Sequence, residues 1–236
     1  MTSPQPDVRT SKGAGMDSFA WAEEAAKKLR EQFGDRLAFV GLQGSRARGE
    51  ETPTSDIDLV VLLDDLDDAD LAAYKAVVQT MPQAELACGF VGSPDVLTKW
   101  PRHELFQFVN DTVPLHGKLP FAPSDFTREE AKDAARIGAS GIYHATCHAA
   151  VFDGNAEEGV LRELAKGAFF TLQALHFSRT GEYVRKKSDL AKVLSGEDAG
   201  VLAWSLKAKA TPKLAPQEVR ELSRLLLRWS GNVIAS

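Results

Sequence analysis

Two aspartates, Asp56 and Asp58, stand one residue apart at the start of an apolar run, residues 57–63. Side chains alternate between the two faces of a strand, so both carboxylates point to one face, about 7 Å apart, and Ile57 points to the other. Two like charges on one face repel each other, and a divalent cation between them would offset this repulsion. Mg²⁺ prefers hard oxygen ligands and completes its shell with water and substrate phosphates. The pair therefore predicts one half of a metal–phosphate site.

A glycine and a serine, Gly44 and Ser45, precede the aspartates by a short loop. Glycine lets the backbone approach a phosphate closely and adopt dihedral angles that other residues avoid. Backbone N–H groups of such a turn, at the start of a short helix, can face an anion, and the serine hydroxyl adds a donor. Other phosphate-binding patterns do not fit, because the sequence contains neither G-x-x-x-x-G-K-[ST] nor G-x-G-x-x-G. The two parts together predict a site for a nucleoside triphosphate with Mg²⁺.

The stretch "GSRARG", followed by "SDIDL", resembles the signature of nucleotidyltransferases in the DNA polymerase β superfamily. The resemblance implies a minimal nucleotidyltransferase α/β fold. It also implies Gly44 and Ser45 as triphosphate contacts, and Asp56 and Asp58 as metal ligands and catalytic residues.

Two further segments are similar to aminoglycoside adenylyltransferases, namely "HFSRTGEYVRKKSDLAKVL" (residues 176–194) and "WPRHELFQF" (residues 100–108). Within the first segment, Lys187 aligns with a family lysine, and Lys186 is the alternative. A lysine here would neutralise the β- or γ-phosphate as a point charge. The likeness implies transfer of AMP from ATP to a hydroxyl group of a small molecule, with an aminoglycoside as the suggested acceptor.

Nucleotidyl transfer also needs a base for the acceptor hydroxyl, and the family pattern places a third carboxylate on an adjacent strand. We assign this role to Glu85, which opens the run "ELACGFVG", with Asp111 as the alternative. We expect Arg46 to face the phosphates and Arg48 to brace the turn.

Hydrophobic periodicity predicts the elements that must position these residues. In the first half, helices are expected at residues 19–33, 69–79 and 94–100, and strands at residues 37–42, 57–63, 85–91 and 105–110. In the second half no convincing strand follows, and helices are expected at about 128–151, 156–179, 188–194, 198–208 and 216–234.

These elements predict an α/β (α+β) chain in which a small mixed-sheet nucleotidyltransferase domain precedes an all-α helical bundle. The predicted domains span residues 16–123 and 124–236, after a polar tail at residues 1–15 that is expected to be disordered.

The 236 residues carry a net charge of −5, which argues against general nucleic-acid binding and suits a polycationic acceptor. The apolar runs are too short to cross a membrane, and the start of the chain lacks the apolar segment of a signal peptide. With two cysteines and no disulfide pattern, the cytoplasm is the expected location.

The leading hypothesis is a Mg²⁺-dependent transferase that moves AMP, or another nucleoside monophosphate, from its triphosphate to a small-molecule hydroxyl. One alternative is AMPylation of a partner protein, as in antitoxin-type minimal nucleotidyltransferases. Another is a nucleotide-binding sensor that has lost transfer, since Glu85 lies at the edge of its predicted strand and not inside it. The sequence makes no prediction of the oligomeric state or of the preferred nucleotide.

Overall fold

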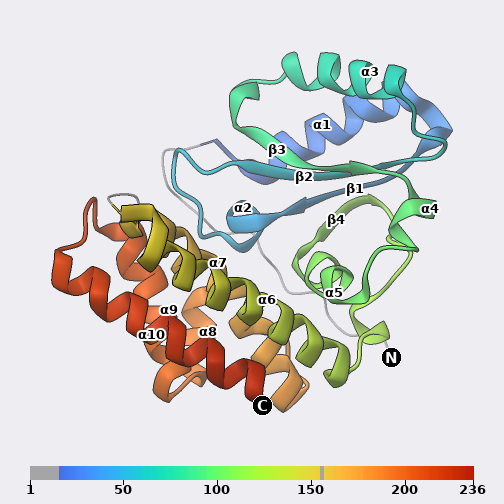
Figure 1. The fold of residues 1–236 in the computed structure, drawn as a ribbon. Helices are drawn as coiled ribbons and strands as arrows, with labels where there is room; N and C mark the ends of the chain where they lie inside the picture. Colours follow the sequence, from blue (N-terminus) through green and yellow to red (C-terminus); the bar gives the residue numbers. More distant parts are fainter. Residues whose placement is uncertain (1–15, 155–156) are drawn as a thin grey trace. The chain divides into compact units, whose positions relative to one another are not determined.

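The computed structural model describes residues 16–154 and 157–236, so the predicted tail at residues 1–15 lies outside the described residues. The described chain forms two compact units (Figure 1). Unit 1 contains the described residues up to Val96 together with Thr112–Leu119, and unit 2 contains Leu97–Asp111 and Pro120–Ser236. Residues 97–111 are thus grouped with the helical unit, whereas the sequence pattern placed them in the first domain.

Unit 1 is built on a four-stranded sheet in the order β3-β2-β1-β4. The strands are β1 (Leu37–Gln43), β2 (Ile57–Leu63), β3 (Ala87–Gly92) and β4 (Val113–Gly117). Strand β1 runs antiparallel to β2 and β4, whereas β2 and β3 are parallel. The predicted mixed-sheet α/β class is confirmed.

Helices α1 (Ser18–Phe33) and α3 (Asp68–Gln79) supply the helical layer of unit 1 (Figure 1). Asp17 caps α1 by accepting hydrogen bonds from the backbone N–H groups of the first turn. The apolar stripe of α1 packs on the sheet in one core cluster with the residues of β2 at odd-numbered positions, Ile57, Leu59, Val61 and Leu63. Because strand side chains alternate, the residues at even-numbered positions of β2, including Asp58, lie on the opposite face.

The predicted strand at residues 105–110 is wrong. Residues 102–111 form helix α5 (Arg102–Asp111), which buries Leu105, Phe106 and Val109 with helical spacing. The fourth strand is β4, which follows at once and contains Pro114. Proline lacks a backbone N–H group and is tolerated at a sheet edge, which is where β4 lies.

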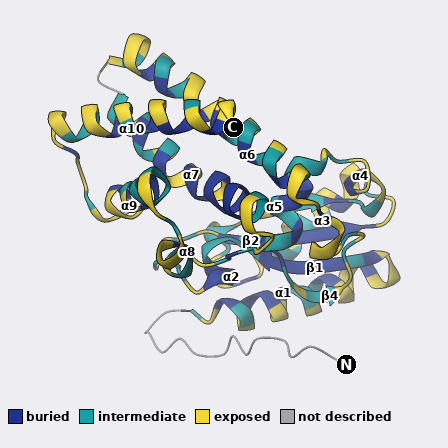
Figure 2. Ribbon diagram, turned by 90° about the horizontal axis from the view of Figure 1, so that it is seen from below, coloured by how far each residue is buried: buried dark blue, intermediate teal, exposed yellow. Residues whose placement is uncertain are grey.

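Unit 2 confirms the predicted helices in the second half. They are α6 (Arg128–His148), α7 (Glu157–Thr180), α8 (Lys187–Val193), α9 (Gly196–Ala210) and α10 (Pro216–Ala235), with a π-helical turn at Ala149–Asp153 after α6. Figure 2 shows buried residues along one side of α10 and exposed residues along the other, as its apolar stripe requires. Among the described residues, every helix is too short or too polar to cross a membrane.

The remaining short elements are α2 (Gly44–Arg48), α4 (Pro94–Leu97) and three 3₁₀ turns at Gly34–Arg36, Ala84–Leu86 and Pro123–Asp125. Two of them, α2 and the turn at Ala84–Leu86, carry residues that the sequence assigns to the site.

Candidate functional site

The glycine–serine turn stands at the end of a central strand, where β1 stops at Gln43 and α2 begins with Gly44. Gly44 has a φ angle of +73°, and a Cβ atom added there would lie 1.9 Å from Oδ2 of Asp58. Gln43 pairs with Asp58 in the β1–β2 register, which explains this close approach. The structure therefore brings the turn and the second aspartate into direct contact, and only glycine leaves room for that carboxylate.

The two aspartates straddle the start of β2. Asp56 is exposed and immediately precedes the strand, whereas Asp58 is its second residue and is half-buried. Ile57 between them is 0% exposed and belongs to the unit 1 core. Burial of Ile57 fixes the strand's register, so the alternation directs its two neighbours away from the core.

Arg46 has a different environment from the one predicted. Its side chain is 4% exposed, and its Nε donates to the carbonyl oxygens of Ser55 at 2.9 Å and Asp56 at 3.1 Å. Its Nη2 also donates to the Ser55 carbonyl at 2.6 Å, and its Nη1 donates to Oγ of Ser18 at 3.0 Å. The guanidinium group thus holds the loop before Asp56 and does not point outward toward a ligand.

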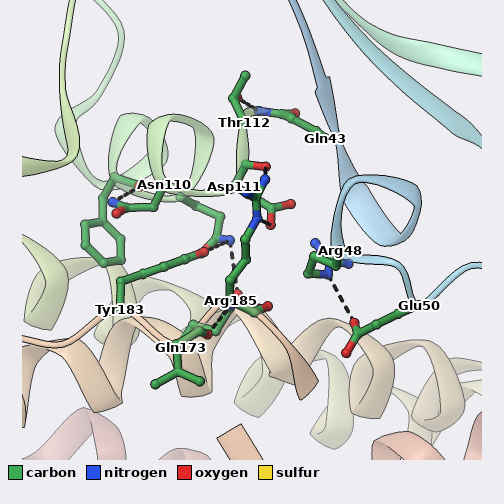
Figure 3. Close-up of polar contacts among 12 residues, drawn as sticks. Gln43, Arg48, Glu50, Asn110, Asp111, Thr112, Gln173, Tyr183 and Arg185 are labelled. Atoms are coloured by element: carbon green, nitrogen blue, oxygen red, sulfur yellow. Dashed lines mark hydrogen bonds and ion pairs between the residues drawn. The ribbon is translucent and has the colours of Figure 1, made fainter. Parts of the chain in front are cut away.

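Arg48, on the same short helix, is 5% exposed and forms an ion pair with Glu50, with 3.2 Å between Nε and Oε2 (Figure 3). Both arginines of "GSRARG" are therefore internal to unit 1.

Glu85 lies outside β3, as an exposed residue of the 3₁₀ turn Ala84–Leu86. Gln83 ahead of this turn has a φ angle of 55°, and the strand begins only at Ala87. In the parallel register Ile57 pairs with Ala87, so Glu85 and Asp56 both lie just before the paired strand starts, at one end of the sheet.

The position that pairs directly with Asp58 is occupied by Cys88, an exposed free thiol. Within residues 16–154 and 157–236, no three or more His, Cys, Asp or Glu side chains form a group that could hold a metal ion. The role of Glu85 as the third carboxylate therefore stays a prediction.

Asp111, the alternative third carboxylate, is the last residue of α5 in unit 2 and is buried. Its Oδ1 lies 3.8 Å from Nε of Arg185, and Nη2 of Arg185 donates to its carbonyl oxygen (Figure 3). This pairing gives Asp111 a structural partner within the helical unit.

A polar network that the sequence pattern did not reveal holds the segment between α7 and α8. Gln173, which is 0% exposed, donates through Nε2 to the carbonyl oxygens of Val184 at 2.9 Å and Arg185 at 3.1 Å. Gln107 of α5 donates to Oε1 of Gln173 at 3.1 Å and to the hydroxyl of Tyr183 at 2.8 Å (Figure 3). A glutamine inside the apolar stretch "TLQALHF" was the available signal, since a buried amide needs partners.

Lys187 is the first residue of α8, directly after the segment that this network holds. Its ammonium lies 5.0 Å from the centroid of the Phe169 ring, within the range of a cation–π interaction. Lys186 occupies the N-cap position. The predicted phosphate contact of Lys187 stays a prediction.

Comparisons with known proteins concern part of unit 1 and the fold of the chain. Residues 22–88 match the family profile described as "Nucleotidyltransferase domain". The matched residues run from within α1 through the glycine–serine turn and both aspartates to the start of β3, so this part of unit 1 resembles a nucleotidyltransferase domain. No curated protein is significantly similar to the chain in sequence.

Two solved structures are also similar. One is spectinomycin adenyltransferase AAD(9) from Enterococcus faecialis, crystallised with ATP and spectinomycin, at a TM-score of 0.56 and 12% identity over 92% of this chain and 99% of that chain. This likeness shows a shared fold. A toxin–antitoxin crystallised with AMP-PNP matches at 20% identity over 56% of this chain and 96% of its own, but its TM-score of 0.30 is too low to establish a common fold.

Proposed function

We propose that this nucleotidyltransferase moves AMP from ATP to a hydroxyl group of a small molecule and releases pyrophosphate. The observation that carries the proposal is the contact between Gly44 and Asp58, where the position of a Cβ atom would be 1.9 Å from the carboxylate. This contact supports the proposal because the turn that would bind the polyphosphate and the carboxylate that would bind a cation lie together, where β1 ends and β2 begins.

The residues of this turn fit Mg²⁺, the metal that the family implies. Asp56 and Asp58 supply hard carboxylate oxygens, and the absent side chain of Gly44 leaves space at Oδ2 of Asp58. When bound, Mg²⁺ would offset phosphate charge and assist the leaving pyrophosphate. The backbone at Gly44 and the Ser45 hydroxyl would orient the triphosphate so that its α-phosphorus faces the acceptor.

Glu85 is our proposed base for the acceptor hydroxyl. Its support is its place just ahead of β3, at the same end of the sheet as Asp56. A pH profile of kcat tests this role, because Glu85→Gln should remove the acidic limb of the profile while Asp111→Asn should leave it. Lys187 is our proposed contact for the β- or γ-phosphate.

An aminoglycoside is the proposed acceptor class. The support is the fold shared with AAD(9), which was crystallised with ATP and spectinomycin, together with the net charge of −5, which suits a cationic acceptor. The free thiols of Cys88 and Cys147 are compatible with the proposed cytoplasmic location.

The test is pyrophosphate release from ATP and Mg²⁺ with a panel of aminoglycosides. We expect release in the wild type and none in the double variant Asp56→Asn plus Asp58→Asn. Asp64→Asn is the matched control, because Asp64 is an exposed aspartate that follows the other end of β2. Release that persists in the double variant would overturn the metal assignment, and adenylation of a protein in place of every small molecule would overturn the acceptor.

A further inference from the structure

The loop between α2 and β2, residues 49–56, contains no helix or strand and ends at Asp56. A ligand carboxylate on such a loop is held no more firmly than the backbone that carries it. Asp58 differs, because its backbone belongs to β2 and is fixed by the sheet. The backbone at Asp56 therefore needs another support.

The end of the loop is a compact turn held by its own residues. The backbone N–H group of Thr52 donates to Oγ of Ser55 at 2.9 Å, and the N–H group of Ser55 donates to the Thr52 carbonyl oxygen at 3.0 Å. The two hydroxyl oxygens lie 3.0 Å apart. These bonds fix the shape of the turn, but none of them joins it to the glycine–serine turn.

Arg46 makes that connection. Its planar guanidinium group donates to the carbonyl oxygens of Ser55 and Asp56, which belong to the two peptide bonds that flank Asp56. The bond from Nη1 to Ser18 holds the far side of the group at the start of α1. A lysine ammonium has no fork of this kind and cannot reproduce the arrangement.

We infer that Arg46 is a positioning residue that sets the backbone at Asp56, and thereby the geometry of the metal ligands; the inference rests on the proposed function. Helix α2 then controls both acids, because it holds Asp56 through Arg46 and meets Asp58 through Gly44. An outer residue that orients a ligand typically contributes about 10-fold to 100-fold in metal affinity or activity.

The chain offers a matched control in Arg36. Its Nη2 donates to the carbonyl oxygens of Asp64 and Asp65, each at 3.1 Å, just beyond the other end of β2. Asp64 follows Asp56 by eight residues, so the two lie about 26 Å apart at the usual strand rise of about 3.3 Å. Arg36→Gln therefore removes the same kind of carbonyl contact just beyond the far end of β2, together with the ion pair between Arg36 and Asp70, without touching the site.

The experiment compares Arg46→Gln, Arg46→Lys and Arg36→Gln with the wild type. Hydrogen exchange of the metal-free proteins reports the backbone, and electron paramagnetic resonance reports Mn²⁺ binding, with Asp56→Asn as the reference for a lost ligand. We expect faster exchange at residues 52–57 and about tenfold weaker Mn²⁺ binding in Arg46→Gln. Arg46→Lys should lie between Arg46→Gln and the wild type. Arg36→Gln should speed exchange only beyond residue 63 and bind Mn²⁺ as the wild type does.

Unchanged Mn²⁺ binding in Arg46→Gln would overturn the inference, as would equal weakening in Arg36→Gln. If Arg46→Gln fails to fold, Arg46→Lys and Ser18→Ala replace it, because Ser18→Ala removes the acceptor of Arg46 Nη1. Hydrogen exchange at residues 52–57 as slow as in the wild type in both variants would also overturn the inference. Failure of the proposed function has a separate signature. A wild type that binds Mn²⁺ through Asp56 but releases no pyrophosphate refutes transfer, while weaker binding in Arg46→Gln still supports the positioning role.

Discussion

Replacing Gly44 by alanine tests whether the contact between the turn and Asp58 matters for transfer. The added Cβ would lie 1.9 Å from Oδ2 of Asp58, whereas ordinary contact begins at 3.4 Å, so the carboxylate must retreat by about 1.5 Å. A displacement of about 1 Å in an active site can reduce the rate roughly 100-fold. We therefore expect kcat to fall by about two orders of magnitude in Gly44→Ala.

Gly49→Ala is the control for backbone strain. Gly44 and Gly49 flank the interior of α2 with φ angles of +73° and +68°, but a Cβ atom at Gly49 meets no atom within 4 Å. Alanine in this left-handed region costs about 1–2 kcal/mol at either position. Thermal unfolding followed by circular dichroism should show a loss of stability in both variants, larger in Gly44→Ala because its Cβ also overlaps Asp58, while pyrophosphate release should collapse only in Gly44→Ala.

Equal kcat values in the two alanine variants would refute this reasoning, whatever their absolute size. Full activity in both would mean that Asp58 can move without consequence. An equal loss in both would assign the effect to the strained backbone of α2, and the short distance between Gly44 and Asp58 would have no catalytic meaning.

Three further predictions concern stability. The hydrogen bond from Arg102 lowers the pKa of Glu130 from 4.5 to about 2, so this pair stabilises the fold above pH 4.5 and its contribution is lost as the pH falls toward 2. Between pH 4.5 and 2 the free energy of unfolding should fall less in Glu130→Gln than in the wild type, by about 1 kcal/mol or less because the pair is partly exposed. An equal fall in both proteins would contradict this prediction. Burial raises the pKa of Tyr74 to about 12, so the free energy of unfolding should fall between pH 10 and 12 and fall less steeply in Tyr74→Phe, as measured with urea. Gln173→Leu deprives two carbonyl oxygens of their donor and should lower the free energy of unfolding by about 1–3 kcal/mol in urea; a more stable variant would refute the role of the network.

Most helices and two central strands were predictable from the sequence because their patterns are local. Strands β1 and β2 are nearly continuous apolar runs, and the helices of unit 2 show apolar stripes at helical spacing. The segment "LFQFVN" was misleading, since its phenylalanines alternate with Gln107 and imitate a strand. Strand β4 was missed because it contains Pro114, and a proline is tolerated in a strand only at the edge of a sheet. Whether a strand lies at the edge depends on the strand order in space, which the local sequence does not show.

The site was predictable in part for the same reason. The glycine–serine turn followed by two aspartates identified the region of the site. The register of β1 and β2 then brings Gly44 and Asp58 together. The environment of Arg46 was not predictable, because its partners Ser18 and Ser55 belong to α1 and to an irregular loop. The position of Glu85 depends on where β3 begins, and strand boundaries are poorly encoded in local sequence.

The interleaving of the two units along the chain has a consequence for biosynthesis and for dissection. A ribosome must complete α5 before it makes β4, so nascent unit 1 lacks its edge strand while Phe106 awaits partners such as Phe126 and Phe177 that are still to be translated. A fragment that ends at residue 123 would retain α5 but lack Phe177, exposing an apolar surface to solvent. Excising the nucleotidyltransferase half would therefore require replacing residues 97–111 by a linker, and simple truncation should give aggregates.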